Sequence, residues 1–409
     1  MPTTRPPSHA RDRRRTGARA VRAVTLTLVV TLAVGAGAAA AAYRVLDSNI
    51  NDAGDLTGLL GARPTMPTPA TTAPGDAHAG TAVNVLILGS DDRSGQNGVI
   101  GGSMDGMHSD TAIVAHVSAD RTRVELISIP RDLVIDIPSC TTKDGSSTPA
   151  KAQHQINEAF AIGWHHSKDL GTAAACTWKT VETLTHVRLD GFIVVDFVGL
   201  TAMVDAIHGV PICLPQAYDD ENTGLHVLAG PQVFDGKTAV QFARARHDIG
   251  DGSDTQRIVR QHDLMAAMSE KVLSEKTLTS PATLFSFGRA VTGSLTASDG
   301  FASLTDLTGF GLSLRHVGAD RIVFLSMPTA VSPKNKNRVV WAPEADTLWA
   351  RIAADRPVGE APDAEGAPRP TTSAAPPTSD GSEPDANVDT PWTPSGGALT
   401  TAEATARCT

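Results

Sequence analysis

The 409-residue sequence has no excess of basic residues. Its formal net charge is −9, whereas a domain that binds nucleic acids normally carries a positive surplus. We therefore do not expect a general nucleic-acid-binding protein. Apolar residues make up 41% of the chain, an ordinary share for a globular protein, so a sizeable core is expected.

Cysteine is scarce, and no two cysteines have the CxxC spacing. The sequence thus gives no support to a metal–thiolate centre or a dithiol redox site. Cys140 and Cys176 lie in one region of the chain, and we expect them to form a disulfide, as is usual outside the cytoplasm. Cys213 and Cys408 are compatible with a second disulfide, but Cys213 is equally compatible with a buried small hydrophobic residue.

A long uncharged run follows a basic N-terminal arm. Residues 1–22 form the basic arm, and residues 23–43 carry no charge, which is the length that a helix needs to span a bilayer. Because arginines precede the run, we expect a transmembrane helix with a cytoplasmic N-terminus and an extracytoplasmic remainder. The alternative is a cleaved signal peptide, since the run contains small residues suited to cleavage.

Composition divides the rest of the chain into three parts. Residues 44–80 are rich in Pro, Thr and Ala, which is typical of a linker. Residues 357–409 form an acidic segment rich in Pro, Ser and Thr, which is expected to be disordered. Between them, residues 81–356 alternate strand-like and helix-like patterns, which predicts a three-layer α/β/α domain with a central mixed sheet.

The predicted elements follow from apolar runs and their periodicity. Short β-branched runs predict strands at Val83–Leu88, Thr111–Val117, Arg123–Ile129, Phe192–Val195 and Arg321–Leu325. Helical patterns cover Ile156–His165, Thr172–Leu184, Phe197–Ile207, Lys237–Ala245 and Thr255–Leu273. Ser253 followed by Gln256 matches a capping box at the start of the last helix.

The candidate chemistry lies at the ends of the first three strands. GSDDR follows the first strand, HSDT begins the second and IPRD ends the third. If the second and third strands form a hairpin and the first is parallel to the third, four residues converge, with Asp132 next to them: Asp91, Arg93, Asp110 and Arg131. Paired carboxylates suit Mg²⁺ or Mn²⁺, since Mg²⁺ binds one or two carboxylates plus substrate phosphate. Arginine suits bidentate contact with phosphate oxygens.

A second cluster of arginines lies in RARHDIGDGSDTQRIVRQ, residues 244–261. Arg244 and Arg246 share a face if the chain is extended there. Three further residues share one helical face: Arg257, Arg260 and Gln261. A phosphate site is one interpretation. The alternative is a solvated charged surface on which Asp254 pairs with the arginine three residues later.

Eight motifs, in order, resemble those of the LytR-CpsA-Psr family between residue 84 and about residue 273: NVLILGSDDR, SDT, ISIPRD, INEAF, DGFIVVDF, IHGVPICLP, FDGKTAVQFARARH and DTQRIVRQ. The resemblance implies an extracytoplasmic α/β/α enzyme that transfers a glycopolymer phosphate from a polyprenyl pyrophosphate carrier to peptidoglycan. It implies Mg²⁺-linked carboxylates at Asp91 and Asp110. It further implies pyrophosphate contacts at Arg93, Arg131, Arg244 and Arg246, and substrate contacts at Asp254, Arg257 and Gln261, with Arg260 adjacent.

Several points stay open within this resemblance. Gln155 occupies a position where family members often carry lysine, so one phosphate contact is in doubt. An apolar slot for the lipid could lie near Phe197, Val198, Leu200 and Met203, or near Phe285 and Phe287, although ordinary core packing is the favoured interpretation of each residue. Asp132 and Asp91 are candidates for a general base.

Three alternative functions remain. If water were the acceptor at the same site, the protein would be a pyrophosphatase acting on the lipid carrier. If the site catalysed no reaction, the protein would be a binder of lipid-linked glycan. Regulation of transcription fits poorly, because the basic N-terminal arm is too short for a folded DNA-binding module.

Overall fold

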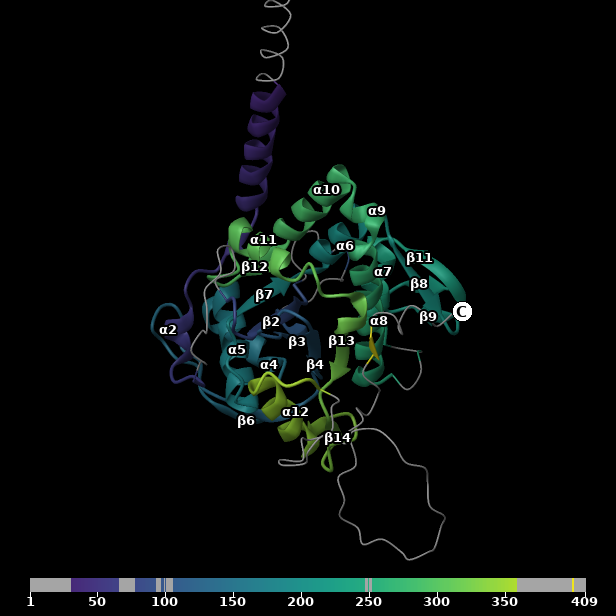
Figure 1. The fold of residues 1–409 in the computed structure, drawn as a ribbon. Coiled ribbons are helices and arrows are strands. Elements are labelled where there is room, and N and C mark those ends of the chain that lie inside the picture. The colour runs from purple at the N-terminus through teal and green to yellow at the C-terminus, as the bar shows by residue number, and fades with distance from the viewer. Residues whose placement is uncertain are drawn as a thin grey trace, which may run out of the picture.

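The computed structural model describes residues 31–65, 78–92, 97–98, 100, 106–246, 249, 252–358 and 399–400. Arg93 and Cys408 lie outside these residues, as do residues 1–30, residues 66–77 of the predicted linker and most of the predicted acidic tail. Residues 31–47 are helical and leave the domain at the top of Figure 1. Within the described part of the chain, no helix has both the length and the apolar character to cross a membrane. The predicted span, residues 23–43, begins outside that part and is not supported by it.

An eight-stranded mixed sheet forms the centre of the domain (Figure 1). In spatial order its strands are β1 (Asn51–Asp52), β12 (Leu295–Ala297), β7 (Gly191–Val195), β2 (Val83–Ser90), β3 (Ser109–Val117), β4 (Val124–Ile129), β13 (Ile322–Ser326) and β16 (Leu399–Thr400). The β2–β3 and β3–β4 pairs are antiparallel, whereas β2–β7 and β4–β13 are parallel. β2 and β4 therefore run in the same direction, as the sequence predicts, and the mixed sheet is confirmed.

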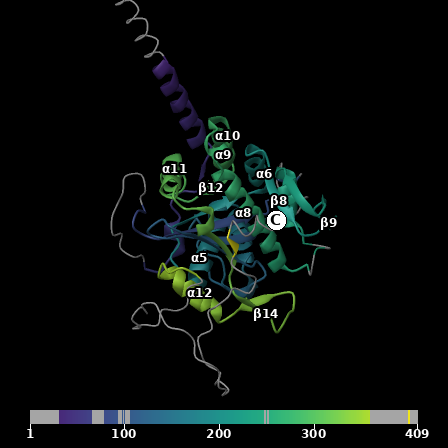
Figure 2. The same cartoon turned by 45° about the vertical axis from the view of Figure 1, so that its right-hand side comes forward.

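The sheet separates two layers of helices (Figures 1 and 2). The helices are α2 (Thr57–Leu60), α4 (Glu158–Ser167), α5 (Leu170–Thr185), α6 (Phe197–Ala206), α7 (Gly236–Arg244), α8 (Asp254–Leu273), α9 (Glu275–Leu278), α10 (Pro281–Thr292), α11 (Leu304–Ser313) and α12 (Glu344–Ala353). On one face, Leu86 and Leu88 of β2 pack with α4, α5 and α12. On the other, Val85 packs with Phe301 near α11, and Phe324 of β13 packs with α8. Burial on both faces explains why these strands are almost continuously apolar.

Four two-stranded sheets accompany the central sheet in the described part of the chain. They pair β5 (Val134–Ile137) with β6 (Lys151–Gln155), β8 (Val210–Leu214) with β11 (Gly230–Phe234), β9 (Tyr218–Asp220) with β10 (Leu225–Val227), and β14 (Thr329–Val331) with β15 (Val339–Trp341). The β8–β11 and β9–β10 pairs lie beside α7 at the right of Figure 1. β14 lies at the bottom of Figure 1, next to α12.

The predicted disulfide between Cys140 and Cys176 is present, with 5.3 Å between the Cα atoms. It joins the loop after β5 to the middle of α5. The backbone N–H of Cys140 donates to the hydroxyl of Thr148, 3.0 Å away, and the N–H of Thr148 donates to the carbonyl of Cys140 at 2.8 Å. The disulfide therefore also fixes the segment that leads into β6. Cys213 is disulfide-bonded as well.

Element boundaries differ little from the predicted ones, and two differences have clear causes. β3 begins at Ser109 rather than Thr111, because Ser109 still pairs with Ser90 across a register shift. α5 begins at Leu170 because the side chain of Asp169 accepts from the N–H of Thr172 and so caps the helix. The predicted disordered tail has two described pieces: residues 357–358, where the N–H of Val358 donates to a carboxylate oxygen of Glu125, and Leu399–Thr400, which pairs antiparallel with β13.

Candidate functional site

The β3–β4 hairpin brings the first two candidate residues together. Asp110 lies at the start of β3 and Arg131 directly after β4. Nη1 of Arg131 lies 2.9 Å from Oδ1 of Asp110. β2 runs beside this hairpin, and a Cβ on Gly89 would lie only 2.9 Å from Cβ of Thr111, so glycine permits this close approach. The convergence predicted from the strand ends is thus found for Asp110 and Arg131.

The first turn of α8 adds a buried ion pair to the hairpin. The Ser253 side chain caps the helix by accepting from the N–H of Gln256, as the sequence predicts. One turn of helix then pairs Nη2 of Arg257 with Oδ1 of Asp254 at 2.6 Å. The predicted alternative was a solvated pair, but both side chains are about 95% buried. Asp254 also accepts a hydrogen bond from the backbone N–H of Arg131. This bond joins the start of α8 to the β3–β4 hairpin.

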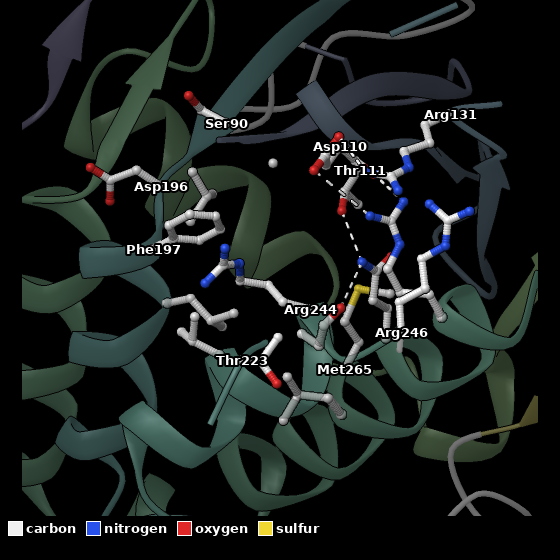
Figure 3. A pocket seen from close by; sticks show the side chains of 18 of the residues that line it. Ser90, Asp110, Thr111, Arg131, Asp196, Phe197, Thr223, Arg244, Arg246 and Met265 are labelled. Atoms are coloured by element: carbon white, nitrogen blue, oxygen red, sulfur yellow. Dashed lines mark hydrogen bonds and ion pairs between the residues drawn. The ribbon is translucent and has the colours of Figure 1, made fainter. Parts of the chain in front are cut away.

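Arg244 and Arg246 approach the same space from the end of α7. Arg244 is the last residue of that helix, and the chain continues in an extended conformation at Ala245. The guanidinium of Arg244 stacks over the ring of Phe197, 4.5 Å from its centroid (Figure 3). Nε of Arg246 donates to the carbonyl of Gly252 at 2.7 Å. Both residues line one cavity, so the two arginine clusters of the sequence meet in space.

This cavity has a volume of about 520 Å³ and two chemically different ends. The polar end holds three arginines around one carboxylate: Arg131, Arg246, Arg257 and Asp110. Across the cavity, Arg244 and a second lining carboxylate, Asp196, lie beside Phe197 (Figure 3). The apolar end is lined by Leu200, Met203, Val240, Leu264, Met265 and Met268. Figure 3 shows Asp110, Arg131 and Arg246 grouped on one side, and Arg244 stacked on Phe197 on the other. The shape and chemistry suit an amphiphile with an anionic group.

Charge and burial set the protonation of the polar end. Burial acts to raise the pKa of Asp110, but the guanidinium groups of Arg131 and Arg257 outweigh it and hold that pKa below its ordinary value. Burial acts to lower the pKa of Arg131, but Asp110 and Asp254 raise it above its ordinary value. Burial, with a smaller contribution from the guanidinium groups of Arg131 and Arg246, lowers the pKa of Arg257, yet a guanidinium stays protonated in proteins. Asp110 is therefore a carboxylate and the arginines are cations at neutral pH.

Other predicted residues lie behind the cavity wall. Asp132 is buried, with its Oδ2 3.8 Å from Nη2 of Arg246 and its Oδ1 3.6 Å from Nη1 of Arg338. Arg260 is buried as well and donates to the carbonyl of Ala245, so it does not lie on the solvated surface that was the alternative. Asp132 and Arg260 therefore do not line the cavity, but they contact Arg246 and Ala245, at the end of a segment that does.

Gln261 and Asp91 complete the predicted set. Gln261 lines the cavity and donates to the hydroxyl of Thr111 at 3.1 Å and to the carbonyl of Ala243 at 3.2 Å. Asp91 is buried, and its backbone N–H donates to the carbonyl of His108 at 2.8 Å. This bond places Asp91 at the same sheet edge as Asp110. Arg93 lies outside the described residues.

The donor set suits a divalent ion held partly by substrate. Among the described residues, no group of three or more His, Cys, Asp or Glu side chains is arranged to hold a metal. Mg²⁺ does not require one, since one or two carboxylates plus phosphate oxygens and water suffice. Asp110 is ionised, half-buried and on the cavity surface, and Asp91 follows the neighbouring strand. These two residues fit the carboxylate part of such a site.

Some residues that line the cavity were not predicted from the sequence, although their helical spacing from Arg257 and Gln261 could have identified them. Leu264, Met265 and Met268 follow Arg257 and Gln261 on the same side of α8, and all line the cavity. Among the expected lipid-slot residues, Phe197, Leu200 and Met203 line it, whereas Val198, Phe285 and Phe287 do not. Asn222 and Thr223 come from the β9–β10 connection, and no periodic pattern marks them.

The chain belongs to the LytR_cpsA_psr family, whose sequence profile matches residues 63–353. This match confirms the resemblance seen in the motifs. It spans the central sheet from β2 to β13 and the helices that build the cavity. The family therefore accounts for the whole cavity.

Two curated relatives indicate what such proteins do elsewhere. The cell wall biosynthesis protein LcpA of Corynebacterium glutamicum is 30% identical over 263 residues, which cover 60% of this chain and 50% of that protein. A polyisoprenyl-teichoic acid–peptidoglycan teichoic acid transferase, TagU of Oceanobacillus iheyensis, is 28% identical over 198 residues, covering 48% and 54% of the two chains. The matched region thus spans about half the length of either relative.

Solved structures share the fold at low identity. The protein gbs0355 of Streptococcus agalactiae superposes with a TM-score of 0.52 at 20% identity, covering 67% of this chain and 88% of that one. TagV of Bacillus subtilis gives 0.50 at 19% identity, with 68% and 99% covered. These similarities support the architecture of the mixed α/β domain.

Proposed function

We propose that this protein transfers a glycopolymer phosphate from a polyprenyl pyrophosphate carrier to peptidoglycan. The cavity carries the proposal, because its arginine end and its apolar end together match a pyrophosphate joined to a long hydrocarbon chain. Four guanidinium groups against two lining carboxylates, Asp110 and Asp196, leave a positive surplus for the pyrophosphate. Membership of the family supports the same function, as do the names of LcpA, a cell wall biosynthesis protein, and TagU, a teichoic acid transferase.

Arg131, Arg244, Arg246 and Arg257 would bind and orient the pyrophosphate. Bidentate guanidinium contacts hold phosphate oxygens in a fixed orientation and attract the negative charge that grows in the transition state. Asp91 and Asp110 would hold Mg²⁺ or Mn²⁺, which supplies further charge neutralisation at the phosphate oxygens. The buried pair of Asp254 and Arg257 keeps the arginines in place before substrate arrives.

The proposed reaction exchanges a phosphoanhydride bond for a phosphate ester bond. A hydroxyl oxygen of the acceptor sugar bonds to the phosphorus nearer the glycan, and the hydroxyl proton is released to solvent. The bond from that phosphorus to the bridging oxygen breaks, and polyprenyl phosphate leaves as an anion. Transfer of this kind depends mainly on alignment and on cations around the phosphate, and the cavity offers both.

The same proposal places the domain outside the cytoplasm, next to a membrane. The disulfide between Cys140 and Cys176 is typical of oxidising compartments. The uncharged run at residues 23–43 would anchor the chain close to its lipid-linked donor. Polyprenyl pyrophosphates are themselves membrane-bound, so the anchor and the donor would share one bilayer.

Donor binding tests the amphiphile assignment. Calorimetry on the full-length protein with Mg²⁺ would compare a polyprenyl-pyrophosphate-linked sugar with the matching polyprenyl monophosphate and uncharged polyprenol. We expect the pyrophosphate to bind at least about 10-fold tighter than the other two, because each charge-assisted contact contributes about 1.5–3 kcal/mol. Equal affinity for all three lipids would contradict the assignment. Product analysis with and without acceptor then separates a transferase from a pyrophosphatase.

A further inference from the structure

A second cavity lies on the other side of the β3–β4 edge. It has a volume of about 490 Å³, between β6, α4 and the segment before β6. Its polar lining residues are His108, Thr148, Lys151, Gln155, Asn157, Glu158, His165 and His166. Pro149, Ala161 and Ile162 supply small apolar surfaces. None of these side chains belongs to the arginine cavity, so its function is unassigned.

Two connections join this cavity to the phosphate site. His108 precedes Asp110 by two residues, and its carbonyl accepts from the N–H of Asp91. Gln155 forms the second connection: in the amide orientation that satisfies its neighbours, its nitrogen donates to Oδ1 of Asp132 at 2.9 Å. Asp132 in turn contacts Arg246 of the arginine cavity. A molecule in the second cavity would therefore lie close to residues that contact the arginine cavity.

One lining group in this cavity lacks a partner. Asn157 is the N-cap of α4, but its side chain makes no capping hydrogen bond. Its buried Oδ1 has no hydrogen-bond partner among the described residues. Buried polar atoms in native proteins are almost always satisfied. An N–H or O–H group of a ligand in this cavity would satisfy the oxygen.

The lining also defines the ligand's chemistry. Amide and carboxylate side chains, here Gln155, Asn157 and Glu158, exchange hydrogen bonds with hydroxyl and acetamido groups. Lys151 adds a cation, and one carboxylate oxygen of Glu158 is already hydrogen-bonded to Nδ1 of His154, 2.7 Å away. The balance favours a hydroxyl-rich sugar that carries a carboxylate. Unlike the arginine cavity, this one has no long apolar end.

We propose that the second cavity binds the acceptor, an amino sugar of peptidoglycan with its carboxylate-bearing substituent, next to the donor phosphate. The inference rests on the proposed transferase function and adds a site to it. The disulfide supports this site, because Thr148 of the cavity wall is hydrogen-bonded to Cys140. Donor and acceptor would thus approach the Asp110 edge from opposite sides.

The test measures acceptor binding separately from turnover. A soluble disaccharide–peptide fragment of peptidoglycan would be titrated into the full-length protein, with and without saturating donor, and followed by calorimetry. The variant Lys151→Ala/His165→Ala removes two partly or fully exposed lining groups. We expect it to weaken fragment binding at least about 10-fold while donor binding stays unchanged, since neither residue lines the arginine cavity.

The matched control is Lys143→Ala/His226→Ala, which removes the same residue types from exposed positions away from the cavity. Thermal unfolding would verify that both variants fold. Equal fragment affinity in the variant and the wild type would overturn the proposal, as would no fragment binding by the wild type in either condition. Failure of the transferase function itself has a different signature, namely loss of donor binding by the wild type.

Discussion

Oδ1 of Asp110 and Nη1 of Arg131 lie 2.9 Å apart at the edge of the central sheet. The contact joins the second residue of β3 to the second residue after β4, so the β3–β4 hairpin itself sets it. Asp110 also lies 3.8 Å from Nη1 of Arg257. One carboxylate thus orients two cations that face the same cavity. The arrangement prepares the polar end of the cavity before any ligand binds.

Replacing Asp110 tests whether this carboxylate acts in turnover. Asp110→Asn keeps the shape of the side chain but removes its charge, and with it one proposed metal contact. We expect the transfer rate to fall about 10²-fold or more, the scale seen when one electrostatic group is removed from an active site. The measurement is a single-turnover assay, with circular dichroism to verify folding. Full activity in Asp110→Asn would favour a non-catalytic binder.

The apolar end of the cavity predicts dependence on the lipid chain. Met268→Asp would place a carboxylate among the lining side chains. Because burying one such side chain contributes about 1.5–3 kcal/mol, we expect a long-chain donor to bind about 10-fold or more weakly, and a short-chain donor to change little. Leu273→Asp, at an exposed position of the same helix, is the control. An equal loss for both chain lengths would place the lipid elsewhere.

The buried His262 should make the free energy of unfolding depend on pH. It is buried beneath β4, with Nε2 2.8 Å from the Ser128 hydroxyl, and burial lowers its pKa from 6.5 to about 4. Between these values the unfolded chain takes up a proton that the folded chain does not. The free energy of unfolding should therefore fall by up to ~3 kcal/mol as the pH drops from 6.5 to 4.

The matched experiment replaces the titrating ring. His262→Gln should lose less stability over that pH range than the wild type, whereas His226→Gln, at an exposed position, should behave like the wild type. Chemical denaturation at pH 6.5, 5 and 4 measures the effect. Identical pH dependence in the wild type and His262→Gln would show that His262 is not the group responsible.

The disulfide should stabilise both the domain and the second cavity. It closes a loop of 36 residues between Cys140 and Cys176, for which loop entropy gives about 4 kcal/mol. Cys140→Ser/Cys176→Ser should unfold at a correspondingly lower denaturant concentration. Relative to the wild type, it should lose more affinity for the peptidoglycan fragment than for the donor. A loss below about 1 kcal/mol would mean that the surrounding packing holds the loop without the bond.

The sequence predicts the sheet edge well because strand pairing follows from local patterns. Apolar runs and the short break after β3 place Asp110 and Arg131 together, and helical spacing places Arg257 and Gln261 on one face. Burial of charge is different. Asp254, Arg257 and Arg260 look like surface residues in sequence, because their burial depends on contacts with the distant β3–β4 hairpin and the end of α7.

The second cavity could not be predicted from the sequence either. Lys151 and Gln155 belong to β6 and His165 belongs to α4, so their approach depends on how α4 packs beside β6. The Asp132–Gln155 contact joins the segment before β5 to the end of β6, and Arg338 reaches Asp132 from the connection between β14 and β15. No periodicity encodes such long-range contacts. The motif INEAF marks the segment but not the space beside it.

The central claim is most directly tested by a transfer assay with a purified donor and acceptor. Full-length protein, Mg²⁺, a polyprenyl-pyrophosphate-linked glycan and peptidoglycan oligomers would be incubated, and the oligomers analysed by mass spectrometry. Arg244→Ala removes one cavity arginine, and Arg321→Ala, at an exposed position, is its control. We predict glycan phosphate attached to the oligomer by the wild type and Arg321→Ala, and little by Arg244→Ala. Release of glycan phosphate without attachment, or equal attachment by Arg244→Ala, would contradict the account.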